Sequence, residues 1–562
     1  MARLGRIKTP HGNLETPTLL PVVNPKILTL SMEELRRCGA HGIITNSYII
    51  YKNHELKKKA EDEGIHAMLG WDGPIMTDSG TFQSHVYGEI DMKPEVILGF
   101  QKSIGVDIGT VLDVFTEPGT RFKEATQELE ETQKRIEDAD KNKEEMMLAA
   151  PIQGGRHLDL RSKAASDASK TNAELFPIGG VVPLMEQGRF QQLVKVVFAV
   201  KKELDMSKPV HLFGCGHPML FALAVFMGCD IFDSSSYAKF ASRDSLMFTW
   251  GTRKLDDLEV LPSEFSAAPD ISIKELKTME AGKRQQIIAM HNLIVSFTEI
   301  RRVKQAIHEG TLWELVENRL RNSPALMKVF EVLKKERKWL SKFEPAYRYK
   351  TPVKTGVESD ERPVFANIAN SFGKGDMTHP YFGKMPAHLS ETYPFHPGLL
   401  QKDVEGWKMQ EWDVKRVRTI LDYQFGKGIG DTFTSGEIEL VTSKKTKRLR
   451  NLMLDGKHLA SLSHRRGLFI LQERGAELIQ NNTDFPRFRV IIDPETAAFN
   501  RDGKSVFCKF VKDIDQDLGC MDECIVVTPD DKLVAFGKLI VSPEELKLGQ
   551  QGMAVRVRGG IP

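Results

Sequence analysis

The sequence predicts an α/β protein that begins with a (β/α)8 TIM barrel, continues through small α+β domains and ends in a β-rich domain. Two observations carry this prediction. Eight short apolar runs, each ending in small or polar residues, precede residue 240, and stretches of helical character separate them. Strands that alternate with helices form parallel sheets, and eight such units are typical of a closed barrel. From residue 485 onward, alternating apolar residues and turn residues predict strands without intervening long helices.

The strand ends of the barrel carry the residues of interest. The eight candidate strands lie at residues 16–25, 41–50, 73–83, 109–119, 148–155, 175–184, 209–218 and 229–238. In barrels of this kind the carboxyl ends of the strands build the active site. The polar and glycine residues at these ends are Asp78, Asp113, Gln153, Gly179, Gly180, Gly214, Gly216 and Asp233. We therefore expect these residues to meet in one site.

The rest of the chain divides by composition. The barrel is expected to occupy residues 1–342, with helix-rich residues 268–342 completing it. Residues 343–405, which are rich in proline, glycine and aromatic residues, are expected to form a transition into a second domain. A small α+β domain is expected at residues 406–484, and a compact β-rich domain at residues 485–562.

The bulk composition is that of a globular protein. The 562 residues are 41% hydrophobic and 27% charged, and the net charge is +2. This balance neither requires nor excludes nucleic acid, because a local basic face can bind phosphates on a neutral protein. No apolar stretch of about 18 residues predicts a membrane span. The six cysteines are scattered and do not form a disulfide framework, so we expect a cytoplasmic protein with no membrane partner.

Residues 76–83, MTDSGTFQ, carry the most specific pattern. They resemble the Asp-Ser-Gly-x-Phe-Gln signature of the tRNA-guanine transglycosylase family. Further strings follow in the order of that family: LDVFTEPG, PIQGG, PIGGVVPLM, GCGHP and DIFDSSSYA. The strings GGVVPLM and FDSSSYA resemble the archaeal branch. Near the end of the chain, DGKSVFCKFV, KLVAFGKLIVSPEEL and GMAVRVRGG resemble a PUA domain, an RNA-binding module.

The resemblance implies a pentosyltransferase that exchanges a D-arm guanine of tRNA for 7-cyano-7-deazaguanine (preQ0) in archaeosine biosynthesis. Exchange of one base for another conserves the glycosidic bond, so it needs neither ATP nor a redox cofactor. Retention of the sugar configuration requires two displacements through a covalent ribosyl-Asp intermediate. The resemblance assigns catalysis to Asp78 and Asp233. One carboxylate attacks the ribose and the other moves the proton, and the sequence leaves the division between them open.

The other motif residues are expected to hold the base. A base that is cut out must leave its stack, so the pocket reads a flipped purine by its edges. Asp113 and Gln153 offer an acceptor and an amide to a guanine-like edge. Glycines without a Cβ let backbone N–H groups approach closely, and Phe82 could stack on the purine. The predicted substrate-binding residues are Ser79, Phe82, Asp113, Gln153, Gly179, Gly180 and Val181.

The chain departs from the family at a structural zinc site. The resemblance implies zinc bound by Cys-x-Cys-x2-Cys and a downstream histidine. The corresponding residues 258–276 contain no cysteine, and only His291 remains. One imidazole cannot make a tetrahedral site. We therefore expect no cofactor and no metal, with the helix that bears His291 held by apolar packing instead.

The expected partners are tRNA and the preQ0 base, and the resemblance also implies a homodimer. Clustered lysines and arginines are predicted to contact RNA phosphates. In the stretch 444–466 they are Lys444, Lys445, Lys447, Arg448, Arg450, Arg465 and Arg466. In the PUA-like domain they are Lys509, Lys538, Arg556 and Arg558.

Two other functions share part of this pattern. A paralogue such as archaeosine synthase has the barrel and the PUA domain but modifies the inserted base. Such paralogues are expected to lack the Asp signature and to carry a Pro-Cys-rich motif, whereas this chain keeps TDSG and has no such motif. Loss of zinc is a trait that the chain would share with them. A non-catalytic tRNA-binding subunit would be expected to lose Asp78 or Asp233, and both are present.

Overall fold

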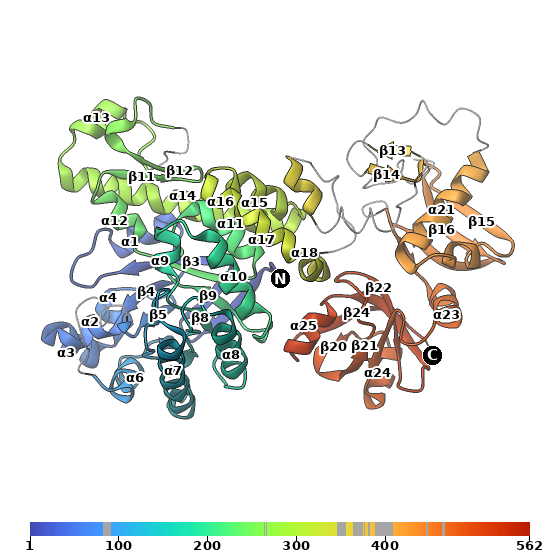
Figure 1. Ribbon diagram of the computed structural model, residues 1–562, viewed down its shortest axis with the longest axis horizontal. Helices are drawn as coiled ribbons and strands as arrows, with labels where there is room; N and C mark the ends of the chain where they lie inside the picture. The colour runs from blue at the N-terminus through green and yellow to red at the C-terminus, as the bar shows by residue number, and fades with distance from the viewer. Residues whose placement is uncertain are drawn as a thin grey trace. The chain divides into compact units, whose positions relative to one another are not determined.

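The chain folds into two compact units, Met1–Val332 and Leu333–Pro562 (Figure 1). The structure is a computed structural model that describes residues 1–81, 92–262, 265, 267–344, 356–362, 375, 377–379, 383–387, 409–445, 448–463 and 467–561. Most of the predicted transition segment at 343–405 lies outside the described residues. Among the described residues, no helix is both long and apolar enough to span a membrane.

The first unit contains the eight predicted barrel strands. They are β3 (Thr18–Val23), β4 (Ile43–Asn46), β5 (Ile75–Asp78), β6 (Ile108–Thr110), β7 (Met147–Ala149), β8 (Phe176–Ile178), β9 (Val210–Leu212) and β10 (Ile231–Ser234). All neighbours are parallel, in the order β7-β6-β5-β4-β3-β10-β9-β8. Parallel bridges from Ala149 to Leu175 and from Ile152 to Ile178 join the two edges. The predicted barrel is confirmed.

A hairpin that the sequence analysis did not predict packs into the barrel interior. Strands β1 (Gly5–Thr9) and β2 (Gly12–Thr16) pair in antiparallel fashion. Ile7 and Leu14 on this hairpin belong to the same buried cluster as Leu20, Ile44 and Met76 of the barrel strands. The hairpin therefore extends the barrel core.

Helices follow the strands and surround the barrel (Figure 1). They are α1 (Met32–Cys38), α2 (Ser47–Lys52), α3 (His54–Glu63), α4 (Ile65–Leu69), α6 (Pro94–Ser103), α7 (Phe122–Asn142), α8 (Leu158–Ala168), α9 (Val182–Glu186), α10 (Phe190–Lys201), α11 (Pro218–Phe226) and α12 (Ser236–Ala241). Local sequence signals mark where such helices begin. At the start of α1, for example, Ser31 and Glu34 form a capping box. In the densely charged α7, residues Leu129 and Ile136 lie on a narrow buried face.

The segment after the barrel is helical, as predicted. Strands β11 (Ser245–Phe248) and β12 (Gly251–Lys254) form a hairpin. The helices that follow are α13 (Ile273–Thr278), α14 (Ala281–Glu309), α15 (Leu312–Leu320), α16 (Pro324–Met327), α17 (Val329–Lys335) and α18 (Arg337–Leu340). The long helix α14 contacts α1, α11, α12 and β11, so it fastens the last part of the barrel to the first.

The second unit contains two sheets. The first is antiparallel, in the order β15 (Ile438–Thr442), β16 (Leu449–Leu454), β17 (Lys457–Leu462) and β18 (Phe469–Leu471). Its helices are α21 (Met409–Phe425), α22 (Ile429–Thr432) and α23 (Glu473–Asn481). The second sheet has six strands: β19 (Arg489–Ile492), β20 (Val506–Phe507), β21 (Val511–Ile514), β22 (Glu523–Val527), β23 (Leu533–Leu539) and β24 (Met553–Gly560). Helices α24 (Ala497–Arg501) and α25 (Pro543–Leu548) accompany this sheet, and the short hairpin of β13 (Met377–His379) and β14 (Gly383–Met385) precedes both sheets.

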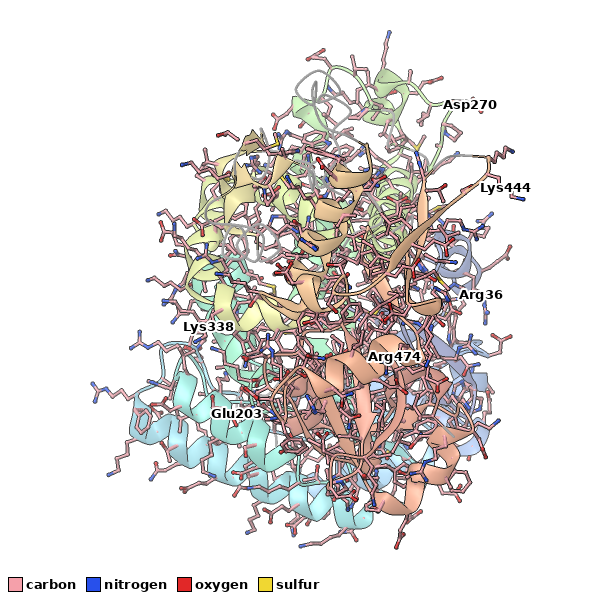
Figure 2. The ribbon with its side chains drawn as sticks, turned by 90° about the vertical axis from the view of Figure 1, so that its right-hand side faces the viewer. Arg36, Glu203, Asp270, Lys338, Lys444 and Arg474 are labelled. Atoms are coloured by element: carbon pink, nitrogen blue, oxygen red, sulfur yellow. The ribbon has the colours of Figure 1, made fainter. Side chains whose placement is uncertain are left out.

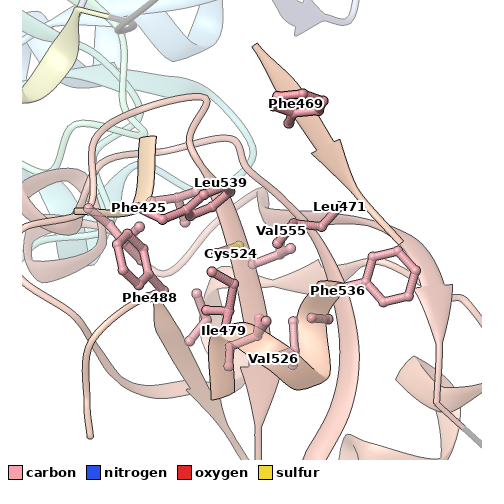
Figure 3. Close-up of a cluster of buried hydrophobic side chains, with 14 of the residues drawn as sticks. Phe425, Phe469, Leu471, Ile479, Phe488, Cys524, Val526, Phe536, Leu539 and Val555 are labelled. Atoms are coloured by element: carbon pink, nitrogen blue, oxygen red, sulfur yellow. The ribbon is translucent and has the colours of Figure 1, made fainter. Parts of the chain in front are cut away.

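The two sheets of the second unit share one hydrophobic core. Helix α23 contacts β17 of the first sheet and both β22 and β23 of the second. Its fully buried Ile479 lies near Cys524 and Val526 of β22 (Figure 3). A domain boundary drawn between these two sheets would therefore cut through one continuous hydrophobic core. Truncation near residue 485 would expose that core, so single substitutions are better tests of this region.

We expect Ile479→Ala to destabilise both sheets together. Removal of a buried isoleucine side chain costs about 2–5 kcal/mol, because the cavity is only partly refilled. Amide hydrogen exchange should therefore accelerate in β16 and β17 as well as in β22 and β23. The exposed Asn481 at the end of the same helix supplies the control Asn481→Ala. Acceleration confined to the first sheet would contradict the shared core.

Candidate active site

Three carboxylates lie at the carboxyl end of the barrel, where the sequence predicts them. Asp78 ends β5, Asp233 lies near the end of β10, and Asp113 follows β6. Gln153 follows β7, and Gly179 and Gly180 follow β8 directly. Because the strands are parallel and the sheet closes on itself, all of these residues gather around one opening. Phe82, the predicted stacking residue, lies outside the described residues.

The backbone around Asp78 makes a tight turn that depends on Gly80. This glycine has φ +98°, and a Cβ at its position would lie 2.4 Å from the Cβ of Tyr48. The Asn46 side-chain amide donates to Asp78 Oδ2 at 3.1 Å, and the Ser47 hydroxyl donates to the Asp78 carbonyl at 2.8 Å. The Ser79 hydroxyl donates inward to the Val111 carbonyl at 3.1 Å. The turn therefore fixes the Asp78 carboxyl in place.

Asp78 is poised to hold a proton near neutral pH. Burial and, to a smaller extent, the negative charges of Asp113 and Asp233 raise its pKa to about 7, against the opposing effect of the N–H groups of Gly80 and Ser79. Burial also raises the pKa of Asp113, against hydrogen bonds from Thr81 and Gln153. A group with a pKa near the working pH can both give and take a proton, which is what a general acid and base must do.

Asp233 has a different environment from Asp78. Its Oδ1 lies 2.9 Å from His211 Nε2 and accepts the Gly214 N–H at 2.7 Å. Because a carboxylate oxygen accepts hydrogen bonds, this contact favours the His211 tautomer that carries its proton on Nε2. Gly214 has φ +68°, and a Cβ there would lie 2.3 Å from Val182 Cγ2. The glycine is therefore needed to bring its N–H to the carboxylate.

Asp113 and Gln153 form a buried pair. Gln153 Nε2 donates to Asp113 Oδ2 at 2.5 Å. Gln153 Oε1 is buried and has no hydrogen-bond partner among the described residues. A Cβ on Gly179 would lie 2.5 Å from Gln153 Nε2, so this glycine leaves room for the amide. The Gly179 N–H donates to the Ile152 carbonyl at 3.2 Å, so it is already engaged within the protein. Of the two glycines predicted to approach a base, Gly180 is therefore the one whose N–H is considered further. Val181 is fully buried at the start of α9.

Three neighbours of the site were not predicted: Asn46, His211 and Arg161. Asn46 ends β4, so the strand-end rule that found Asp78 could have found it. The Arg161 guanidinium is buried beneath the Gln153 loop and donates to the carbonyls of Ile152 and Gly155 at 2.5 and 2.9 Å. Burial lowers its pKa to about 9, and the charge of Asp113 opposes this shift. No sequence motif marked Arg161 or the strand residue His211.

The comparisons with known proteins agree with this geometry. A family model described as "Queuine tRNA-ribosyltransferase" matches residues 1–325, which contain the barrel and its carboxylates. The chain belongs to the tRNA-guanine transglycosylase family. Two further models, "Patch-forming domain C2 of tRNA-guanine transglycosylase" and "PUA domain", match residues 415–486 and 488–561. The predicted family and the predicted PUA domain are confirmed, and the family makes the chain a pentosyltransferase.

Three full-length relatives of this transglycosylase carry the printed name "tRNA-guanine(15) transglycosylase". The protein of Thermococcus kodakarensis is 42% identical over 566 residues, which cover 100% of this chain and 97% of the relative. That of Methanocaldococcus jannaschii is 37% identical over 642 residues, covering 100% and 98%. That of Thermoplasma acidophilum is 36% identical over 622 residues, with the same coverage.

His291, the histidine that the family resemblance links to a zinc site, lies among aromatic side chains. His291 is fully buried, with the ring of Phe265 stacked on it at 4.9 Å and that of Phe248 tilted at 5.1 Å. Its Nε2 lies 3.0 Å from the Met247 carbonyl. Burial lowers the pKa of His291 to about 4 despite this bond, so the ring is neutral. The described groups around His291 are two aromatic rings and a backbone carbonyl, which are not the thiolate, imidazole or carboxylate ligands that zinc takes.

The predicted RNA-binding residues have unequal exposure. Lys444 lies exposed at the tip of the β15–β16 hairpin (Figure 2). Its neighbour Lys445 is exposed as well, and so are Arg448 and Arg450. Lys447, Arg465 and Arg466 lie outside the described residues. In the PUA domain, Lys509 and Arg556 are exposed, whereas Arg558 is ion-paired with Glu523. Lys538 is only 6% exposed. It lies on β23, a central strand of the second sheet, and this burial does not favour the predicted contact with RNA.

We expect the stability of the enzyme to depend on pH through Asp78. Its folded-state pKa lies above the unfolded value of about 4, so the free energy of unfolding falls as pH rises from about 4 to about 7. Asp78→Asn removes the buried charge. Its melting temperature should therefore exceed that of the wild type by more at pH 8 than at pH 5, as measured by calorimetry. The exposed Asp270 supplies the control Asp270→Asn. The same difference at both pH values would refute this assignment.

Proposed function

We propose that this enzyme exchanges guanine 15 of tRNA for preQ0 in archaeosine biosynthesis, through a covalent ribosyl-Asp intermediate. The position of the base comes from the printed names of the full-length relatives. The observation that carries the mechanism is the contrast between the two carboxylates. Asp78 has a pKa of about 7, whereas Asp233 is held by a backbone N–H and an imidazole. Two carboxyl groups in different environments divide acid–base and nucleophilic roles.

In this proposal Asp233 is the nucleophile. A carboxylate oxygen of Asp233 bonds to C1′ of the ribose as the bond from C1′ to guanine breaks, and the protonated Asp78 gives its proton to the leaving guanine. The incoming base then loses its N9 proton to Asp78 and attacks C1′, which releases the Asp233 carboxylate. Two inversions retain the sugar configuration, and the carboxylates stabilise an oxocarbenium-like transition state. Atoms and charges balance without a metal or a redox partner.

The buried pair of Asp113 and Gln153 is proposed to recognise the base. A 7-deazaguanine and a guanine share the N1–H and the exocyclic amine, which are donors, and the O6 acceptor. Asp113 and the unpartnered Gln153 Oε1 can accept from the donors, and the Gly180 N–H can approach the base because no Cβ intervenes. Unsatisfied polar atoms in a buried pocket favour a ligand that completes their hydrogen bonds. Ser79 and Val181 are proposed to shape the backbone on either side of the base. Phe82 is still proposed to stack on the base.

We expect Asp78→Asn and Asp233→Asn each to lower the rate of guanine exchange on the order of a thousandfold or more. The reason is that each removes a group that acts directly on the reacting bonds, while the RNA-binding surface is unchanged. Exchange is measured by release of labelled guanine from tRNA, and tRNA affinity by filter binding. In wild type, a denaturation-resistant protein–RNA adduct should form when no incoming base is supplied, and Asp233→Asn should abolish it. Near-normal exchange in Asp233→Asn would rule out that residue as the nucleophile.

We also propose that the exposed basic residues Lys444, Lys445, Arg448 and Arg450, together with Lys447, bind tRNA phosphates, and that Lys509, Arg556 and Arg558 extend this contact. In the part of the chain that the structure describes, no carboxylate lies within ion-pair distance of Lys444 or Lys445. Surface lysines without acidic partners favour phosphate, because binding releases counterions from the RNA.

Lys444→Glu with Lys445→Glu should weaken tRNA binding and flatten its dependence on salt. Each lost phosphate contact reduces the slope of log affinity against log salt by about one. The matched control is Lys457→Glu, which reverses an exposed charge at the opposite end of the same sheet. Affinity is measured across a salt series. Equal slopes for the double variant and the control would show that the hairpin tip does not bind RNA.

Three further proposals rest on the sequence and the family. The family zinc is not bound at His291, because aromatic rings and a carbonyl surround that imidazole. Two chains pair as a homodimer, as the family resemblance implies. The chain works in the cytoplasm, where its six unpaired thiols would stay reduced.

A further inference from the structure

Two histidines and an aspartate meet at the amino end of the barrel, away from the carboxylates of the active site. His11 lies between the hairpin strands β1 and β2, His66 lies in α4, and Asp107 directly precedes β6. His11 Nδ1 is 2.9 Å from Asp107 Oδ1, and His66 Nε2 is 3.2 Å from Asp107 Oδ2. One ligand atom from each residue lies within 4.8 Å of the other two.

The hydrogen bonds around this cluster orient its ligand atoms. His66 Nδ1 lies 3.0 Å from the Trp71 carbonyl, which can only accept, so the proton of a neutral ring is on Nδ1. The Nε2 lone pair then faces a carboxylate oxygen. This nitrogen is buried and makes no hydrogen bond of normal geometry among the described residues. A histidine held by a backbone carbonyl so that its other nitrogen faces inward is typical of metal ligands.

Asp107 is likewise held by its neighbours. Its Oδ2 accepts the Ile75 N–H at 2.8 Å, and its Oδ1 accepts the His11 N–H at 3.2 Å. The side chain is buried, whereas the His11 side chain is 42% exposed. The cluster therefore has a rigid, buried carboxylate on one side and solvent on the other.

We propose that His11, His66 and Asp107 bind a divalent transition-metal ion of the zinc class. Two imidazole nitrogens and a carboxylate oxygen are the ligands that zinc takes in sites with three protein ligands, and the exposed side at His11 leaves the fourth position to water. Zinc bonds of about 2.0–2.1 Å place tetrahedral ligand atoms roughly 3.3 Å apart. The observed distances are of this size: 2.9 Å from His11 Nδ1 to Asp107 Oδ1 and 3.2 Å from His66 Nε2 to Asp107 Oδ2. They end at different oxygens of the carboxylate, so one nitrogen must shift toward the oxygen that binds the ion. The two rings are stacked with centroids 3.6 Å apart and planes at 23°, so the half-exposed His11 ring must turn out of the stack for both nitrogens to face one ion.

The position of the site indicates a structural role. Asp107 lies beside Ile75, the first residue of β5, while Asp78 is the last. Three residue steps of a strand separate the two ends by roughly 10 Å, so the metal does not touch the exchanging base. A metal here would tie the hairpin and α4 to the start of β6. It is separate from His291, and it revises the expectation of a metal-free chain.

The test uses full-length protein that has been stripped with a chelator and titrated with cobalt(II), which reports tetrahedral nitrogen and oxygen ligands by its visible absorption. We expect one cobalt per chain, displacement by zinc, and a higher melting temperature in the presence of zinc. His66→Gln and His11→Gln should each lose the absorption and the zinc-dependent shift in melting temperature. The controls are His291→Gln, at the position of the family zinc, and His54→Gln, at an exposed surface position; both should keep the absorption.

If a variant fails to fold, X-ray absorption spectroscopy of the zinc-loaded wild type still tests the proposal, because it identifies the ligands of the bound zinc directly. Two imidazoles and oxygen ligands around zinc would support the site. Absence of imidazole scattering, no binding to the wild type, or undiminished binding by His66→Gln would each overturn it. Loss of binding in His291→Gln alone would place the metal at the family position instead.

Discussion

Closure of the barrel forces three carboxylates into one buried site, and the rest of that site depends on how their repulsion is relieved. The bridges between β7 and β8 complete a ring in which Asp78, Asp113 and Asp233 face the same opening. Each of the three carboxyl groups is relieved of this repulsion in a different way. Asp233 receives a backbone N–H and an imidazole, Asp113 receives the Gln153 amide, and Asp78 takes up a proton near pH 7. Because their environments differ, one carboxyl group can attack while another moves protons.

Local contacts also hold His291, the histidine that the family resemblance links to a zinc site. Around His291, the rings of Phe248 and Phe265 and the Met247 carbonyl form a buried shell. Such a shell makes the imidazole part of the core, so His291→Ala would leave both a cavity and an unpaired carbonyl. The cost would therefore exceed that of a packing change alone.

The barrel strands, the strand-end residues and the family were predictable because periodicity and short motifs are local properties of the sequence. Asp78, Asp113 and Asp233 each follow an apolar run that can be recognised alone. The hairpin of β1 and β2 was not predicted, since its burial comes from residues of distant strands. Arg161, His211 and the His11–His66–Asp107 cluster were missed for the same reason. The burial of Lys538 on a central strand also depends on sheet order, which alternation alone does not specify.

The most direct test of the central claim is transfer of labelled preQ0 into tRNA. The purified wild-type chain is incubated with the labelled base and unfractionated tRNA, and radioactivity in the RNA is compared with that of an otherwise identical reaction using a tRNA transcript that lacks a guanine at position 15. The account predicts that label enters the unfractionated tRNA with release of guanine, and that none enters the altered transcript. Binding of tRNA with no label incorporated would contradict it, and would mean that the barrel carboxylates do not perform base exchange.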